Sequence, residues 1–139
     1  MIYRIDARVV APVRDTEVTA RVEDAVRNLF PNVEFERREA ALVGTTHSLE
    51  RFSERLHEQE ILDTARREFG KHADTDGFSF ALKKQAAFKS TINFAVGNPD
   101  ELGDIEIHVT VHEPDVESYI DYVAPPTEDG KPVDFDDSA

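Results

Sequence analysis

The pattern of apolar and polar residues divides the chain into alternating segments and segments with helical spacing. The clearest alternation runs over 105–112, where Ile105, Ile107 and Val109 are separated by polar residues. Similar alternation covers 2–11 and the shorter segments 33–37, 41–46, 78–83 and 91–96. A period of two is typical of a strand with one buried face, so each of these segments is predicted to be a β-strand.

Four other segments repeat apolar residues every three or four positions, which predicts amphipathic helices. The first is expected to begin at Asp15 or Thr16, both suitable N-caps, and to end near Phe30, before Pro31. The second follows Ser48, and the third ends near Gly70. The last covers about 114–123.

The order of these elements predicts an α+β fold in two layers, with one mixed, mainly antiparallel sheet and helices on one face. The neighbouring segments 78–83, 91–96 and 105–111 are expected to pair in turn as an antiparallel meander. A length of 139 residues is enough for one domain with a real core. We place this domain at 1–124 and interpret 125–139 as an acidic, Pro- and Gly-containing disordered tail.

The amino-acid composition indicates the kind of solution in which the protein works. The sequence has 29 acidic residues against 16 Lys and Arg, a net charge of −13, and no Cys. Dispersed acidity with few Lys indicates adaptation to a high-salt cytoplasm, because the Debye length falls to about 3 Å in molar salt and repulsion is screened. The alternative is an acidic protein with basic partners. No apolar segment is long enough to cross a membrane, so a cytoplasmic location without membrane partners is expected.

One stretch departs from this acidity. Gly77–Pro99 contains no Asp or Glu but three lysines, Lys83, Lys84 and Lys89. Four phenylalanines, Phe78, Phe80, Phe88 and Phe94, also lie in it. A segment free of acids in such a chain indicates a buried centre, a surface where negative charge is unfavourable, or both.

The same stretch carries a resemblance to a known family. Leu82-x-Lys84-Gln85-Ala86-Ala87 followed by Asn93-Phe94, with supporting segments at 61–66, 103–105 and 124–127, resembles the archaeal uncharacterised protein family 0201. The resemblance covers Met1 to about Val133. It implies an archaeal host and a fold similar to that of large-subunit ribosomal protein five. Members are often labelled RNA-binding or exosome subunits. One departure is a Trp, usual just before the Ala-Pro segment, which is replaced here by Tyr122 or Val123.

These residues define a candidate RNA-binding site. Lysine ammonium groups would neutralise phosphates, an amide would hydrogen-bond a base edge or a 2′-OH, and Phe88 would stack on a base. Phosphate contacts weaken in high salt, which favours the amides and an aromatic ring over the lysines. Arg66 either joins the patch or pairs with acidic neighbours on its helix. In the alternative interpretation the lysines are solvated and Phe88 is core. The candidates are Lys83, Lys84, Gln85, Lys89, Asn93 and Arg66.

The sequence contains no recognised motif for metal binding, cofactor binding or catalysis. His108 and His112 would lie about 13 Å apart on one strand, too far to share a metal, and no HExxH, CxxC, GxGxxG or Walker motif occurs. We therefore expect no metal and no cofactor, and a non-catalytic RNA-binding or RNA-associated module more than an enzyme. The alternative is a homodimeric assembly module whose acid-free stretch forms a two-fold interface. An enzyme with an unrecognised cleft is the third possibility.

Overall fold

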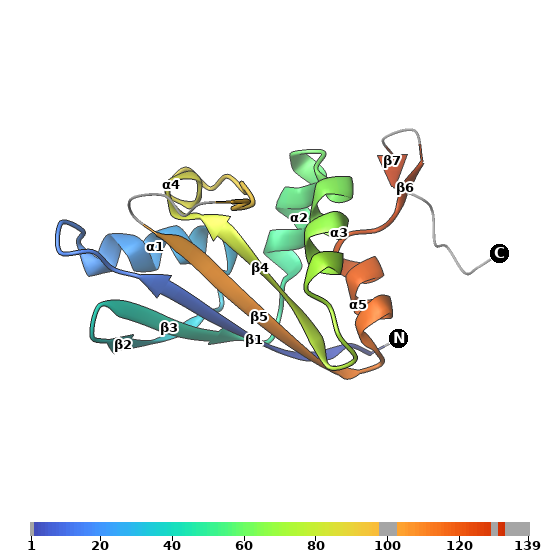
Figure 1. Cartoon of the computed structure of the whole chain (residues 1–139), viewed down its shortest axis with the longest axis horizontal. Coiled ribbons are helices and arrows are strands. Elements are labelled where there is room, and N and C mark those ends of the chain that lie inside the picture. Colours follow the sequence, from blue (N-terminus) through green and yellow to red (C-terminus); the bar gives the residue numbers. More distant parts are fainter. Residues whose placement is uncertain (1, 98–102, 129–130, 133–139) are drawn as a thin grey trace.

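The computed structural model describes residues 2–97, 103–128 and 131–132. Five strands form one sheet in the order β2-β3-β1-β5-β4 (Figure 1), and each of the four pairings is antiparallel. The strands are β1 Arg4–Pro12, β2 Glu34–Arg38, β3 Ala41–Thr46, β4 Gly77–Lys83 and β5 Asp104–Glu113. The described sheet is thus antiparallel throughout rather than mixed.

The helices cover one face of this sheet, as predicted, and the α+β class is confirmed (Figure 1). They are α1 Thr19–Leu29, α2 Glu50–Glu58, α3 Leu62–Lys71, α4 Lys84–Ala87 and α5 Val116–Val123. Among the described residues, no helix is both long and apolar enough to cross a bilayer. The expected likeness to the ribosomal protein fold stays a prediction.

The alternation of each strand explains how the layers pack. In β1 the side chains of Ile5, Ala7 and Val9 are buried against the helices, while the residues between them face outward. Phe52 of α2 stands at the centre of an aromatic cluster, with ring centroids 5.3 Å from Phe30 and 5.2 Å from Phe80. This cluster fixes β4, and therefore the start of α4, against α2.

Two predicted elements differ from the structure. The helix expected from Asp15 or Thr16 begins only at Thr19, because Glu17 closes a turn in which its N–H donates to the Arg14 carbonyl at 2.9 Å. The predicted strand 91–96 makes only an isolated bridge, Leu82 to Phe94, on the outer side of β4. The expected meander is therefore wrong: β5 pairs directly with β4 and lies between β4 and β1.

The predicted disordered tail lies only partly within the described residues. There, β6 Thr127–Glu128 pairs antiparallel with β7 Lys131–Pro132. Residues 129–130 and 133–139 lie outside the described ranges. The boundary of the domain at residue 124 stays a prediction.

Candidate functional site

An open hollow of about 650 Å³ lies at the end of β4, around α4. It brings together four of the six candidate residues, Lys83, Gln85, Lys89 and Asn93. The other described residues of its lining are uncharged: Ala86, Phe88 and Thr91. Among the described residues, the lining therefore carries two ammonium groups and no carboxylate, in a chain whose net charge is −13.

A tight reversal of the chain creates this hollow. After α4, the N–H of Thr91 donates to the Ala86 carbonyl and that of Ser90 to the Ala87 carbonyl, each at 3.0 Å. With Ser90 at a φ of 57°, this is the Schellman pattern that ends a helix. The returning chain then runs beside β4, where the Lys83 N–H donates to the Asn93 carbonyl at 2.8 Å. Lys83 and Asn93 thus come together although ten positions separate them.

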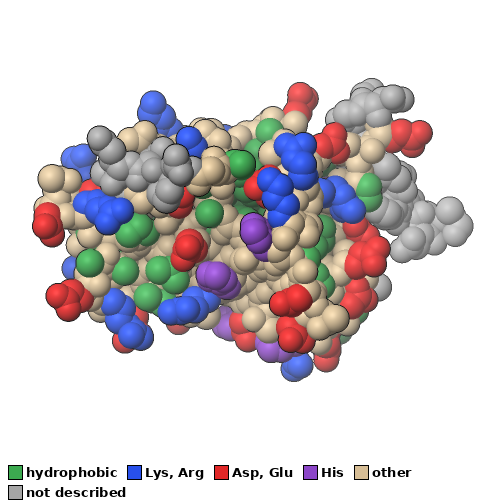
Figure 2. Space-filling view, viewed as in Figure 1, with side chains coloured by type: hydrophobic (Ala, Val, Ile, Leu, Met, Phe, Trp, Pro, Cys, Tyr) green, Lys and Arg blue, Asp and Glu red, His purple; other side chains and the backbone are tan. Residues whose placement is uncertain are grey.

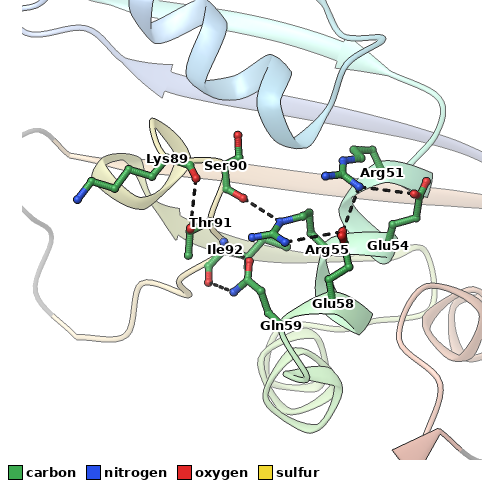
Figure 3. A network of polar contacts seen from close by, with 9 residues as sticks. All are labelled: Arg51, Glu54, Arg55, Glu58, Gln59, Lys89, Ser90, Thr91 and Ile92. Atoms are coloured by element: carbon green, nitrogen blue, oxygen red, sulfur yellow. Dashed lines mark hydrogen bonds and ion pairs between the residues drawn. The ribbon is translucent and has the colours of Figure 1, made fainter.

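Helix α2 fastens the returning segment from one side (Figure 3). The Gln59 amide pairs with the backbone of Ile92 in both directions, donating to its carbonyl at 2.9 Å and accepting from its N–H at 2.8 Å. The Arg55 guanidinium donates to the Ser90 carbonyl at 2.9 Å. Gln59 thereby supplies the bonds that a further strand beyond 91–96 would have made, while Asn93 and Ala95 bond the backbone of β4 on the other side.

The prediction that Lys84 contacts a ligand at the surface is wrong. Its side chain is fully buried, and its ammonium lies 2.9 Å from a carboxylate oxygen of Glu17 and donates to the Pro12 carbonyl. The alternation of inward-facing residues in β4 extends to this position, since Phe78, Phe80 and Leu82 all face the core. The same period of two places Lys84 on the inward side, but its charge led to the expectation of a surface contact.

Arg66 also lies outside the hollow. Its guanidinium donates to the Asp121 carboxylate at 2.7 Å and to the Ala124 carbonyl at 2.8 Å. It therefore ties α3 to the end of α5, a structural role. Sequence reasoning expected its acidic partners on its own helix and could not see this long-range pair.

The four phenylalanines of the acid-free stretch divide into two groups. Phe78, Phe80 and Phe94 are at most 7% exposed and contact other rings in the core. Phe88 is 39% exposed and lines the hollow. One aromatic face is therefore available beside the amides of Gln85 and Asn93, which are both exposed.

A second polar cluster stands at the opposite end of β1. The Asp6 carboxylate contacts His112 of β5 and His47 after β3, each at 2.7 Å. The hydrogen bond from His112, followed by that from His47, lowers the pKa of Asp6, although partial burial opposes the shift. Within the described ranges, no three His, Asp or Glu side chains are arranged to hold a metal ion.

Comparison with known proteins relates the chain to archaeal sequences and structures, although no family model matches it. A UPF0201 protein of Methanopyrus kandleri is 41% identical over 132 residues, covering 85% of this chain and 83% of the relative. A UPF0200/UPF0201 protein of Archaeoglobus fulgidus is 36% identical over 130 residues; these are 93% of this chain but only 40% of that relative. The crystal structure of a UPF0201 protein from Methanococcus jannaschii superposes with a TM-score of 0.85 at 30% identity, covering 93% of this chain and 99% of that one.

Proposed function

Since the chain belongs to the archaeal UPF0201 family, we propose that it is a non-catalytic RNA-binding module that holds single-stranded RNA in the hollow at the end of β4. The observation that carries this proposal is the composition of the lining. Amides, lysines and a partly exposed ring meet in one place, and none of the described residues that line it is acidic.

Each lining group matches a part of an unpaired nucleotide. The exposed face of Phe88 stacks on a base, and the amides of Gln85 and Asn93 hydrogen-bond a base edge or a 2′-OH. Lys89 at the rim neutralises a backbone phosphate. Because the fastened backbone of 84–94 fixes these groups, little ordering is required when RNA binds.

We also infer that this function operates in concentrated salt, which the acid excess suits. Under those conditions counterion release contributes little, so phosphate contacts lose most of their value. Stacking and hydrogen bonds are then the main source of affinity. This inference predicts that Phe88 matters more than Lys89 in molar KCl.

The test is the affinity for a short single-stranded RNA, measured by fluorescence anisotropy at several KCl concentrations. Phe88→Ala is expected to weaken binding about 5- to 100-fold, because stacking on an aromatic side chain contributes about 1–3 kcal/mol per base. Lys89→Ala is expected to lower the salt slope of log K by about 0.7, the value for one phosphate contact on a single strand.

Arg67→Ala is the matched control, since it also removes one cation but from an exposed position on α3 outside the hollow. It should leave both affinity and salt slope near those of the parent. If Arg67→Ala and Lys89→Ala lower the RNA affinity equally, binding depends on the overall charge of the protein and not on the hollow. An affinity unchanged by Phe88→Ala in molar KCl would refute the proposed site.

A second candidate function is assembly with another protein. The Archaeoglobus fulgidus relative is named for two families, and this chain spans 40% of its length. We infer that the other part of that relative represents a partner for chains such as this one. Co-purification of the two parts as separate chains tests this, and light scattering of this chain alone tests the homodimer instead.

A further inference from the structure

A second hollow, of about 280 Å³, lies beside the N-terminal strand and has a different composition. Its ring-bearing lining consists of Tyr3, Tyr119 and Tyr122, which are all the tyrosines of the sequence, together with His47. Glu50, at the start of α2, also lines it. The volume is below the roughly 300–1,000 Å³ of typical small-molecule sites, so the hollow fits a single side chain better than a cofactor.

One side of this hollow is formed by packed tyrosine rings. The rings of Tyr3 and Tyr122 stack with centroids 4.3 Å apart, and Tyr119 lies 5.6 Å from Tyr3. Tyr119 is almost fully buried, and burial raises the pKa of its phenol above the ordinary value, so it stays neutral. Tyr122 is 52% exposed. A stacked ring with its outer part in solvent attracts a cation through its quadrupole.

The charge near these rings is negative. Glu50 is exposed, and among the described residues its carboxylate has neither an ion pair nor a hydrogen bond. Asp6 contacts His47 of this lining as well as His112, and its lowered pKa keeps it ionised there. A cation over Tyr122 would find Glu50 beside it, and the net charge of −13 would attract a basic partner from a distance.

We propose that this hollow binds an arginine side chain of a basic protein segment, with its guanidinium stacked on the Tyr3–Tyr122 pair and bonded to Glu50. Arginine fits better than lysine because its planar group can stack on a ring and bond a carboxylate with two parallel N–H groups. The site is distinct from the hollow at the end of β4, so it does not depend on RNA binding.

The three tyrosines make the test direct, because the chain has no Trp and all of its tyrosine fluorescence arises from this hollow. The probe is a blocked Gly-Arg-Gly-Arg peptide, compared with lysine and citrulline versions. We expect a saturable fluorescence change with affinity in the order arginine, lysine, citrulline. Citrulline keeps the shape without the charge, so binding of equal strength would overturn the proposal.

Variants separate this site from general attraction to an acidic surface. Tyr122→Leu is expected to weaken arginine-peptide binding about 2- to 30-fold, the range for a cation–π contact, whereas Tyr122→Phe keeps the ring and should bind like the parent. Glu50→Gln is expected to weaken binding about tenfold or more. Asp24→Asn makes the same change of charge at an exposed position on α1; if it weakens binding as much as Glu50→Gln, the site is refuted.

Discussion

At the scale of single residues, neighbouring lysines have opposite roles. Lys83 lines the hollow, whereas Lys84 is buried beside Glu17, whose side chain is 8% exposed. Removing one partner of a buried ion pair leaves an uncompensated charge, which costs about 3–5 kcal/mol. The buried cation of the acid-free stretch, Lys84, pairs with a carboxylate from another part of the chain, Glu17 before α1. The stretch therefore needs no acidic residue of its own beside this lysine.

We therefore expect Glu17→Gln and Lys84→Met each to lower the free energy of unfolding by about 3–5 kcal/mol. The loss of unfolding free energy in the double variant should be clearly smaller than the sum of the two single losses, because the double variant buries no unpaired charge. Urea unfolding of the four proteins in this cycle measures the coupling. Lys89→Met, an exposed lysine on the same segment, is the control and should change stability by less than about 0.5 kcal/mol. Strictly additive losses would contradict a direct Lys84–Glu17 interaction.

The sequence allowed prediction of the grouping of Lys83, Gln85, Lys89 and Asn93, because they share one segment without acids. It did not reveal Glu17 as a partner, since the two residues are 67 positions apart and a glutamate near a helix start has an ordinary capping explanation. The turn after β1 is held by local bonds between Arg14 and Glu17, but which buried group the Glu17 carboxylate meets depends on the tertiary fold.

At the scale of elements, the segment after α4 has strand-like alternation but behaves as a fastened loop. Buried Ile92 and Phe94 satisfy the pattern that predicted a strand. The hydrogen bonds of Ile92, however, go to the Gln59 side chain at the C-terminal end of α2. Periodicity predicts which residues are buried, but it does not specify which backbone groups pair.

Replacing Gln59 tests this fastening. Gln59→Ala leaves the Ile92 N–H and carbonyl without partners, so we expect a loss of about 1–3 kcal/mol in unfolding free energy and faster hydrogen exchange at the Ile92 amide. Gln59→Glu retains the acceptor but not the donor and should restore protection of that amide in part. Gln85→Ala is the matched control, because Gln85 is exposed on α4. Unchanged exchange at Ile92 in Gln59→Ala would show that packing alone holds the segment.

At the scale of the whole molecule, the acidic charge is spread out. Figure 2 shows Asp and Glu side chains distributed over one face and its rim, with Lys and Arg between them. Ion pairs such as Arg37–Glu23 and Arg51–Glu58 join some of these charges. Exposed pairs of this kind contribute little, typically 0–1 kcal/mol, so repulsion among the excess acids is the larger collective effect.

We expect Tm to rise at pH 7 as KCl increases from about 0.1 to 1 M, because the Debye length falls from about 10 to 3 Å and this repulsion is screened. Near the isoelectric point of about 4.7 the net charge vanishes, and the same salt should then raise Tm much less. Calorimetry at both pH values checks this. A rise of equal size at pH 4.7 would assign the effect to salting-out of apolar groups instead.

The two edge strands of the sheet, β4 and β2, differ in how their outer backbone groups are paired, and this difference limits how copies of the chain can join. Along β4, the outer backbone already bonds within the chain: Ala95 donates to Ala81 at 2.9 Å, and Asp74 donates to Gly77 at the same distance. Strand β2 is the other edge, where Glu34, Glu36 and Arg38 alternate with residues that face α1. A second chain could therefore extend the described sheet past β2, whose outward side chains are charged, and the acid-free stretch could serve a dimer through its side chains but not through continued strand pairing.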